Sequence, residues 1–261
     1  SEYANYVGQA TGNSVTNPGF STDWYDQILR GAWYQSHGLS LSGGSDKMTY
    51  FLSGGYIEDQ GIVIDNKFRR LNLRTNLDFK INKMVKTGII TNFSNINNKT
   101  VNLGTAYNNA YRAAPIIQAK ENGRYGNTSS YQNVGNPILD IENNNARSYG
   151  NRIQATGYLE VKPLDWITLR SSMGGELVSY SDKEYNYRFL NDEVTFLTAG
   201  GNQLNPKSNL SVFKDNYFRW VWDNTVTLNK KIDAHTFTLL VGSTAEEYTA
   251  ENIRAFRQDV P

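Results

Sequence analysis

The chain has 261 residues, a formal net charge of +1 and a mean hydropathy of −0.56. No apolar run approaches the roughly 18 residues of a membrane-spanning helix, and no basic block predicts a nucleic-acid interface. Cysteine is absent, and the two histidines, His37 and His235, lie far apart in the sequence. We therefore expect no disulfide, no metal centre and no cofactor.

Strand-like runs follow one another along the chain, and they alternate apolar and polar residues with a period of two. They cover residues 36–44, 47–56, 71–82, 85–97, 151–162, 166–180, 217–231 and 235–248. The third run is the clearest, with one row of apolar residues at Leu71, Leu73, Leu77, Phe79 and Ile81. Its other row carries Arg74, Asp78 and Lys80. No helical period is sustained, apart from one candidate turn at 23–29.

The connections between these runs alternate in length. They are short, medium, short, long, short, long and short in chain order, with long loops near 98–148 and 183–215. Antiparallel strands joined in this way have the short turns at one end and the long loops at the other, as in outer-membrane barrels. The pattern predicts an all-β, antiparallel transmembrane β-barrel segment of about eight strands within residues 34–250, preceded by an extracellular loop at 1–33.

Aromatic residues cluster towards the ends of the predicted strands. Trp220 and Trp222 are placed near the long-loop end of the seventh run, whereas Tyr50, Phe79 and Trp166 lie near short-turn ends. Two aromatic bands are typical of membrane interfaces. Aromatic residues also favour β-strands in general, so this pattern alone does not separate a membrane wall from a soluble sheet.

No catalytic constellation emerges from the charged residues. Glu160, Glu176 and other carboxylates alternate with Arg170 and Lys162 on the predicted polar faces, but no spacing selects an acid–base pair. We expect no catalytic residue and no enzymatic activity. The long loop at 98–148 instead combines aromatic and amide side chains, which hold sugars or peptides. The predicted substrate-binding residues are Tyr107, Tyr111, Arg112 and Tyr125.

Several stretches, taken in order, resemble one known family. They are Thr22–Asp26, Ser36–Gly44, Tyr50-Phe51, Gly55-Tyr56, Gly61–Val63, Phe68–Arg70, Leu73–Asp78, Arg112–Ile116, Asn122–Tyr125 and Asn136–Ile138. Together they resemble the SusC/RagA family of TonB-linked outer-membrane transporters, from about residue 20 to about residue 250.

The resemblance implies a 22-strand barrel in the outer membrane of Bacteroidota, with short periplasmic turns and long extracellular loops. Members of this family enclose an N-terminal plug domain and couple to TonB through a TonB-box segment. They import glycan oligosaccharides or peptides and are capped by a SusD-like surface lipoprotein. The resembling stretches include neither plug nor TonB box, so we expect the chain to be a middle segment of a longer protein.

Two hypotheses follow for the faces of the sheet. In a barrel wall, Leu71, Leu73, Leu77, Phe79 and Ile81 would contact outer-membrane lipid. The lumen-facing set would be Arg74, Asp78, Lys80, Glu160 and Arg170. The alternative is a soluble β-sandwich or adhesin that binds carbohydrate through its loops, whose apolar faces would pack on each other about 10 Å apart.

Overall fold

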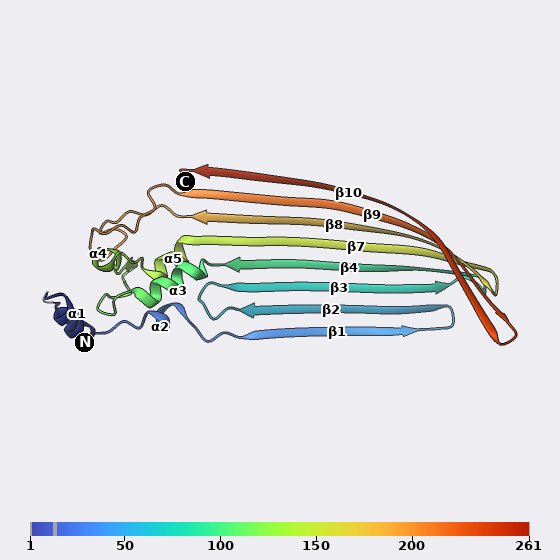
Figure 1. Cartoon of the computed structure of the whole chain (residues 1–261), viewed down its shortest axis with the longest axis horizontal. Coiled ribbons are helices and arrows are strands. Elements are labelled where there is room, and N and C mark those ends of the chain that lie inside the picture. The colour runs from blue at the N-terminus through green and yellow to red at the C-terminus, as the bar shows by residue number, and fades with distance from the viewer. Residues whose placement is uncertain (1, 13–14, 261) are drawn as a thin grey trace.

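The computed structural model describes residues 2–12 and 15–260, and most of it is one long antiparallel sheet (Figure 1). Each strand pairs with the next along the chain, so spatial order follows sequence order. This confirms the prediction of about eight antiparallel strands. The strands are β1 (Tyr34–Gly44), β2 (Met48–Gln60), β3 (Lys67–Lys80), β4 (Val85–Thr100), β7 (Asn144–Leu164), β8 (Ile167–Asn186), β9 (Asn209–Ile232) and β10 (His235–Gln258).

The connections confirm the predicted asymmetry. Turns at 45–47, 81–84, 165–166 and 233–234 lie at one end of the sheet, and the connections 61–66, 101–143 and 187–208 lie at the other (Figure 1). The strands run further into the predicted long loops than the alternating sequence indicates. Strands β9 and β10 have 24 residues each, which at about 3.3 Å per residue corresponds to a length of about 80 Å. A tilted strand needs only about 9–11 residues to cross a bilayer, so both strands extend well beyond one.

Tyr50, Phe79 and Trp166 lie at short-turn ends as predicted, whereas Trp220 and Trp222 do not lie at the long-loop end. Because β9 begins at Asn209, Trp220 and Trp222 fall near the middle of the strand and not at its long-loop end. Trp166 lies in the turn between β7 and β8, with the Nζ atom of Lys230 5.3 Å from the centre of its ring. The predicted aromatic band at the long-loop end is therefore wrong for Trp220 and Trp222.

Short helices gather at the long-loop end of the sheet. They are α1 (Glu2–Thr11), α2 (Trp24–Ile28), α3 (Leu103–Arg112), α4 (Ser129–Gln132) and α5 (Pro137–Asn143), with a two-stranded ribbon of β5 (Lys120–Glu121) and β6 (Arg124–Tyr125). Helix α2 confirms the candidate turn at 23–29, and the others were not predicted. Within the described residues, no helix is both long enough and apolar enough to cross a membrane.

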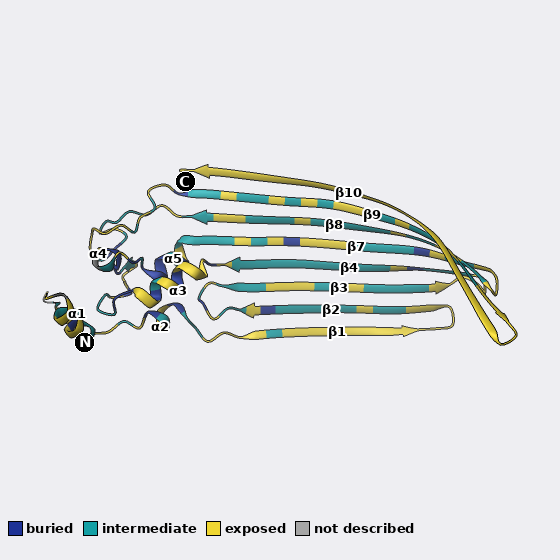
Figure 2. Cartoon of the chain, viewed as in Figure 1, coloured by how far each residue is buried: buried dark blue, intermediate teal, exposed yellow. Residues whose placement is uncertain are grey.

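The hydrophobic core lies among these helices, whereas the strands carry only isolated buried positions, drawn dark blue in Figure 2. We call residues 22–30 and 101–143 the cap. Its core contains Trp24, Ile28, Ala106, Ala110 and Ile141. The indole Nε1 of Trp24 donates to the carbonyl oxygen of Ala114 at 3.0 Å, which joins the first segment of the cap to the second. The long connection is thus a packed unit on the end of the sheet.

The sheet is open, with β1 and β10 as its edges, and nearly every residue of both edge strands is exposed (Figure 2). Long unpaired edges invite pairing with further strands. Within the described residues, the other sheet is the two-stranded ribbon β5–β6, so the structure has one large sheet and not the two facing sheets that the β-sandwich alternative requires.

Candidate functional site

The strand register sorts the side chains of the sheet into two faces. The polar face carries all five residues of the predicted lumen-facing set: Arg74, Asp78, Lys80, Glu160 and Arg170. Lys80 lies opposite Lys86, Lys86 opposite Glu160, and Glu160 opposite Arg170. Together with Lys86 of β4, the five residues, from β3, β7 and β8, form one surface across four strands. Whether this surface lines a lumen stays a prediction.

Near the short turns, the polar face is organised around Tyr158. This ring is 7% exposed, its hydroxyl donates a hydrogen bond to Asp78 Oδ1, and the guanidinium carbon of Arg170 stacks 3.9 Å from its centre. Arg170 also pairs with Glu160 at 3.4 Å. Gly88 lies directly below the ring, where a Cβ atom would approach a ring carbon to 2.6 Å. The charged residues here are held in place by one another.

Nearer the cap, a second network centres on Glu176. Arg152 pairs with this carboxylate, and the hydroxyl of Tyr217 donates to Glu176 Oε1 at 3.2 Å. Beside them Arg219 pairs with Glu246 at 2.6 Å. Tyr158 and Tyr217 were not singled out from the sequence, although both follow the same alternation as the charged residues. That phase is the signal that would have found them.

A hollow of about 720 Å³ opens on this part of the polar face. Arg70, Arg74 and Arg152 line it together with amides and hydroxyls, among them Asn92 and Gln154. Guanidinium and amide groups donate hydrogen bonds to carboxylates, hydroxyls and carbonyls. The surface is therefore suited to solvated, polar solutes. Among the described residues, no group of three or more His, Cys, Asp or Glu side chains is placed to hold a metal ion.

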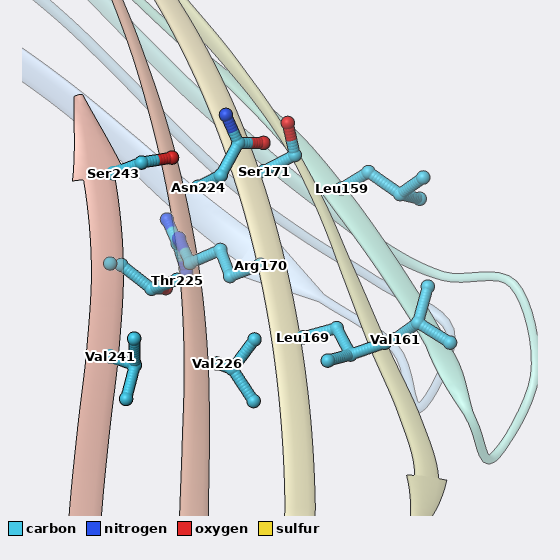
Figure 3. Close-up of a pocket in the computed structure, with 11 residues that line it drawn as sticks. Leu159, Val161, Leu169, Arg170, Ser171, Asn224, Thr225, Val226, Val241 and Ser243 are labelled. Atoms are coloured by element: carbon cyan, nitrogen blue, oxygen red, sulfur yellow. The ribbon is translucent and has the colours of Figure 1, made fainter. Parts of the chain in front are cut away.

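The opposite face is apolar and largely uncovered. Leu71, Leu73 and Phe79 are 38%, 47% and 37% exposed, Leu77 is partly buried, and Ile81 lies just beyond β3. Figure 3 shows a cross-strand row on this face, in a hollow of about 400 Å³, formed by Val161, Leu169, Val226 and Val241.

The apolar residues of this face lie side by side on neighbouring strands, and we call them the apolar belt. The belt includes Leu71, Leu73, Leu77 and Phe79 on β3 and the row of Val161, Leu169, Val226 and Val241. On β8 the belt runs from Ile167 to Leu177, about the length that a tilted strand needs to cross a bilayer. One row inside it is polar: Ser171, Asn224 and Ser243 follow the valine row (Figure 3). The indole of Trp222 donates to Ser171 Oγ at 3.0 Å, so part of this polarity is satisfied within the sheet.

The predicted substrate-binding residues of the long loop fall into two environments. Tyr107 and Tyr111 are one turn apart on α3, 53% and 79% exposed, and the Tyr107 ring lies 5.0 Å from that of Tyr25. Arg112 ends the same helix and is exposed. The structure thus brings three of the four residues to one outer surface of the cap.

Tyr125 has a different environment. It lies in β6, packs against the core of the cap and donates from its hydroxyl to Glu142, while Lys120 Nζ lies 4.5 Å from its ring centre. Burial and the neighbouring carboxylate raise the pKa of its phenol well above the ordinary value. Its polar group is already engaged, so it holds the ribbon β5–β6 to α5.

Two polar side chains, one buried and one partly buried, join the remaining connection, 187–208, to the cap. Asn127 donates to the backbone oxygens of Thr198 and Gly200 at 2.8 and 2.7 Å. Asp140 accepts from Asn109 and Gln203, and burial raises the pKa of its carboxyl. The connection 187–208 and the cap therefore form one connected assembly at the long-loop end of the sheet, and Tyr107 and Tyr111 of α3 are exposed on it.

Comparison with known proteins gives a consistent result. No family model matches the chain. It is 26% identical over 270 residues to the TonB-dependent receptor SusC of Bacteroides thetaiotaomicron, covering 95% of this chain and 26% of the receptor. It is also 25% identical to the TonB-dependent receptor P26 of Formosa agariphila, covering 90% of this chain and 23% of that receptor. The chain spans about a quarter of the length of the curated relatives it matches.

Solved structures agree with these relatives. The RagAB peptide transporter superposes with a TM-score of 0.71 at 17% identity, covering 98% of this chain and 29% of that chain. The closed–closed state of the RagAB peptide importer gives a TM-score of 0.70 at 18% identity, covering 92% of this chain and 27% of that chain.

The chain resembles a segment of a SusC/RagA transporter. This confirms the resemblance predicted from the sequence, and it explains why the sheet is open. An open sheet with β1 and β10 as its edges is what a segment of a longer barrel wall is expected to show. The relatives that the chain matches are named as receptors and transporters.

Proposed function

We propose that the chain is part of the wall of an outer-membrane β-barrel that imports a nutrient, in a multi-pass, integral protein of a bacterial outer membrane. The observation that carries this proposal is the division of the sheet into two faces. Leu73, Leu169 and Val241 belong to a level belt of exposed apolar side chains, whereas Arg74 and Glu160 lie on the other face. An exposed apolar surface of this extent is unfavourable in water and is typical of a surface that contacts lipid.

The polar face is proposed to line the lumen, with the long-loop end and the cap outside the cell. In this arrangement the imported solute passes the hollow near Arg74 and Arg152. The proposed cargo is an oligosaccharide or a peptide, since amide, guanidinium and phenol groups serve both. Tyr107, Tyr111 and Arg112 on the outer surface of the cap are the proposed first contacts, because flat exposed rings stack on sugars or apolar side chains. Tyr125 stays in the proposed set only in a structural role, because its hydroxyl joins the ribbon β5–β6 to α5 within the cap.

The proposed partners follow from the relatives. A SusD-like surface lipoprotein is proposed to cover the long-loop end. TonB is proposed to supply the energy through a region outside this chain, together with a plug domain. The proposed domain layout is one barrel domain over residues 1–261, with an extracellular segment at 1–33 and long loops near 98–148 and 183–215.

The test uses the full-length receptor in its own host. Fractionation is expected to find it in the outer membrane, and its deletion is expected to abolish growth on one oligosaccharide or peptide nutrient. The double variant Tyr107→Ala/Tyr111→Ala is expected to lower uptake of that nutrient several-fold with unchanged receptor levels. The control is Tyr6→Ala, which removes another exposed tyrosine, 70% exposed, on α1. A receptor recovered without detergent, or uptake equal in all variants, would contradict the proposal.

A further inference from the structure

The apolar face carries a row of cations beyond the edge of the apolar belt. Lys67 lies opposite Lys99, Lys99 opposite Arg147, and Arg147 opposite Lys183. Like charges directly opposite each other on neighbouring strands repel, with Cβ atoms about 4.5–5.5 Å apart. Anions beside such a row relieve this repulsion.

Half of the row already has its anions. Lys67 pairs with Glu58, and Lys99 Nζ lies 3.0 Å from Asp65 Oδ2. The other half does not: within residues 2–12 and 15–260, no carboxylate lies within ion-pair distance of Arg147 or Lys183. In the described part of the chain, the guanidinium of Arg147 donates one hydrogen bond, to the side-chain oxygen of Asn145 at 3.3 Å. Two adjacent cations are left for an external anion.

A concave site lies at these two cations. Arg147 and Lys183 line a hollow of about 510 Å³ together with Asn145, Tyr149 and Tyr185. Both cations are exposed on the strands β7 and β8, in the middle of the sheet. A guanidinium fork, an ammonium and an amide around one hollow are the donors that bind a phosphate group.

The height of the hollow identifies the source of the phosphate. From Leu177, at the edge of the apolar belt, to Lys183 the strand advances about 20 Å. With a strand tilt of about 40°, this is about 15 Å along the membrane normal. The hollow then lies at the level of the sugars and phosphates of an outer-leaflet glycolipid, on the side that faces the membrane.

We propose that Arg147 and Lys183 form a binding site for a phosphate group of lipopolysaccharide packed around the barrel. This inference rests on the proposed function, because it needs the apolar belt in the outer membrane and the long-loop end outside. The glycolipid neutralises the unpaired half of the cation row and fixes the height of the wall in the outer leaflet. A free phosphate ion offers the same charge without the anchoring acyl chains.

The test compares the full-length receptor and the double variant Arg147→Ser/Lys183→Ser in nanodiscs that contain rough lipopolysaccharide or its dephosphorylated form. Native mass spectrometry then counts the retained glycolipid. The wild type is expected to retain the phosphorylated form about tenfold better than the variant, and to bind the dephosphorylated form equally weakly in both. The matched control is Lys230→Ser, which removes a cation from the same face at the short-turn end.

The outcomes separate the inference from the proposed function. Equal retention in the wild type and the double variant overturns the site. Displacement of the glycolipid by inorganic phosphate at equal concentration overturns the glycolipid as the occupant of the site. If Lys230→Ser lowers the amount of retained glycolipid as much as the double variant does, the assignment of the phosphate site to Arg147 and Lys183 at the long-loop end is overturned. The double variant is first checked for a heat-modifiable, folded band in gels. A receptor that imports its nutrient but lacks this phosphate dependence contradicts only the glycolipid site.

Discussion

Replacing Asn136 by alanine tests whether the cap is a folded unit. This side chain is 0% exposed. Its Nδ2 donates to the carbonyl oxygens of Ala119 and Gly126, both at 2.9 Å, and its Oδ1 accepts from the backbone N–H groups of Ile138 and Leu139 at 3.0 and 3.4 Å. One amide therefore joins the ribbon β5–β6 to the first turn of α5.

The expected cost follows from these four contacts. Alanine removes one of the two hydrogen bonds that each carbonyl oxygen accepts, at about 0.5–1.5 kcal/mol each, because Ala119 keeps the Gly126 N–H group and Gly126 keeps the Thr128 N–H group. It also removes the N-cap of α5, at about 1 kcal/mol. We therefore expect a total of about 2–4 kcal/mol in the free energy of opening the cap. This corresponds to an opening constant raised by about thirtyfold to about a thousandfold.

Hydrogen exchange followed by mass spectrometry on the full-length receptor in detergent measures this effect. Peptides covering residues 113–143 are expected to lose protection in Asn136→Ala, while peptides from β7 and β8 keep theirs. Asn102→Ala is the matched control, since Asn102 caps α3 through one bond to the Thr105 N–H group at 3.3 Å and is exposed. It is expected to cost only about 1 kcal/mol. Equal exchange in the two variants would refute the reasoning.

Three further predictions concern the sheet and the cap. Leu77→Arg is expected to cost about 2–4 kcal/mol of membrane-embedded stability, measured as urea resistance of the folded band, whereas Asn76→Arg on the polar face should cost much less. Gly88→Ala is expected to cost about 1–3 kcal/mol by the same measurement, because its Cβ atom would lie 2.6 Å from the Tyr158 ring and 2.7 Å from the Leu77 carbonyl oxygen. Burial raises the pKa of Asp140, so its contribution to cap stability is fully present below the ordinary carboxyl pKa of 3.8 and is lost as pH rises through the native value. Protection of residues 137–143, corrected for intrinsic exchange, should decrease over that pH window in the wild type and stay flat in Asp140→Asn.

The two faces of the sheet could be predicted because period-two alternation is a local property. The rows of Leu73 and Arg74 are continued by the register across every strand. The ends of the strands could not be predicted in the same way. Between the apolar belt and the long-loop end both faces of the sheet are polar. Asn151, Ser179 and Asn216 there occupy the face that is apolar in the belt, so the sequence alternation disappears while the strands stay paired.

The cap was missed because its helices are short and their buried faces are small. Helix α3 buries mainly Ala106 and Ala110, whose spacing of four is a weak helical signal. The start of α5 was readable, since Asn136 followed by Pro137 is an N-cap with proline at the first helical position. The assembly of these pieces depends on contacts between distant residues, such as Trp24 with Ala114, which no local pattern contains.

The central claim is that one face of the sheet contacts lipid and the other water. It is tested by placing single cysteines, each carrying a spin label, along β3 of the full-length receptor at positions 71 to 79 and measuring collisions with oxygen and with a water-soluble nickel complex. The account predicts high oxygen accessibility at Leu71, Leu73, Leu77 and Phe79. It predicts high nickel accessibility at Asn72, Arg74, Asn76 and Asp78. Equal accessibility along the strand, or alternation in the opposite phase, would contradict it.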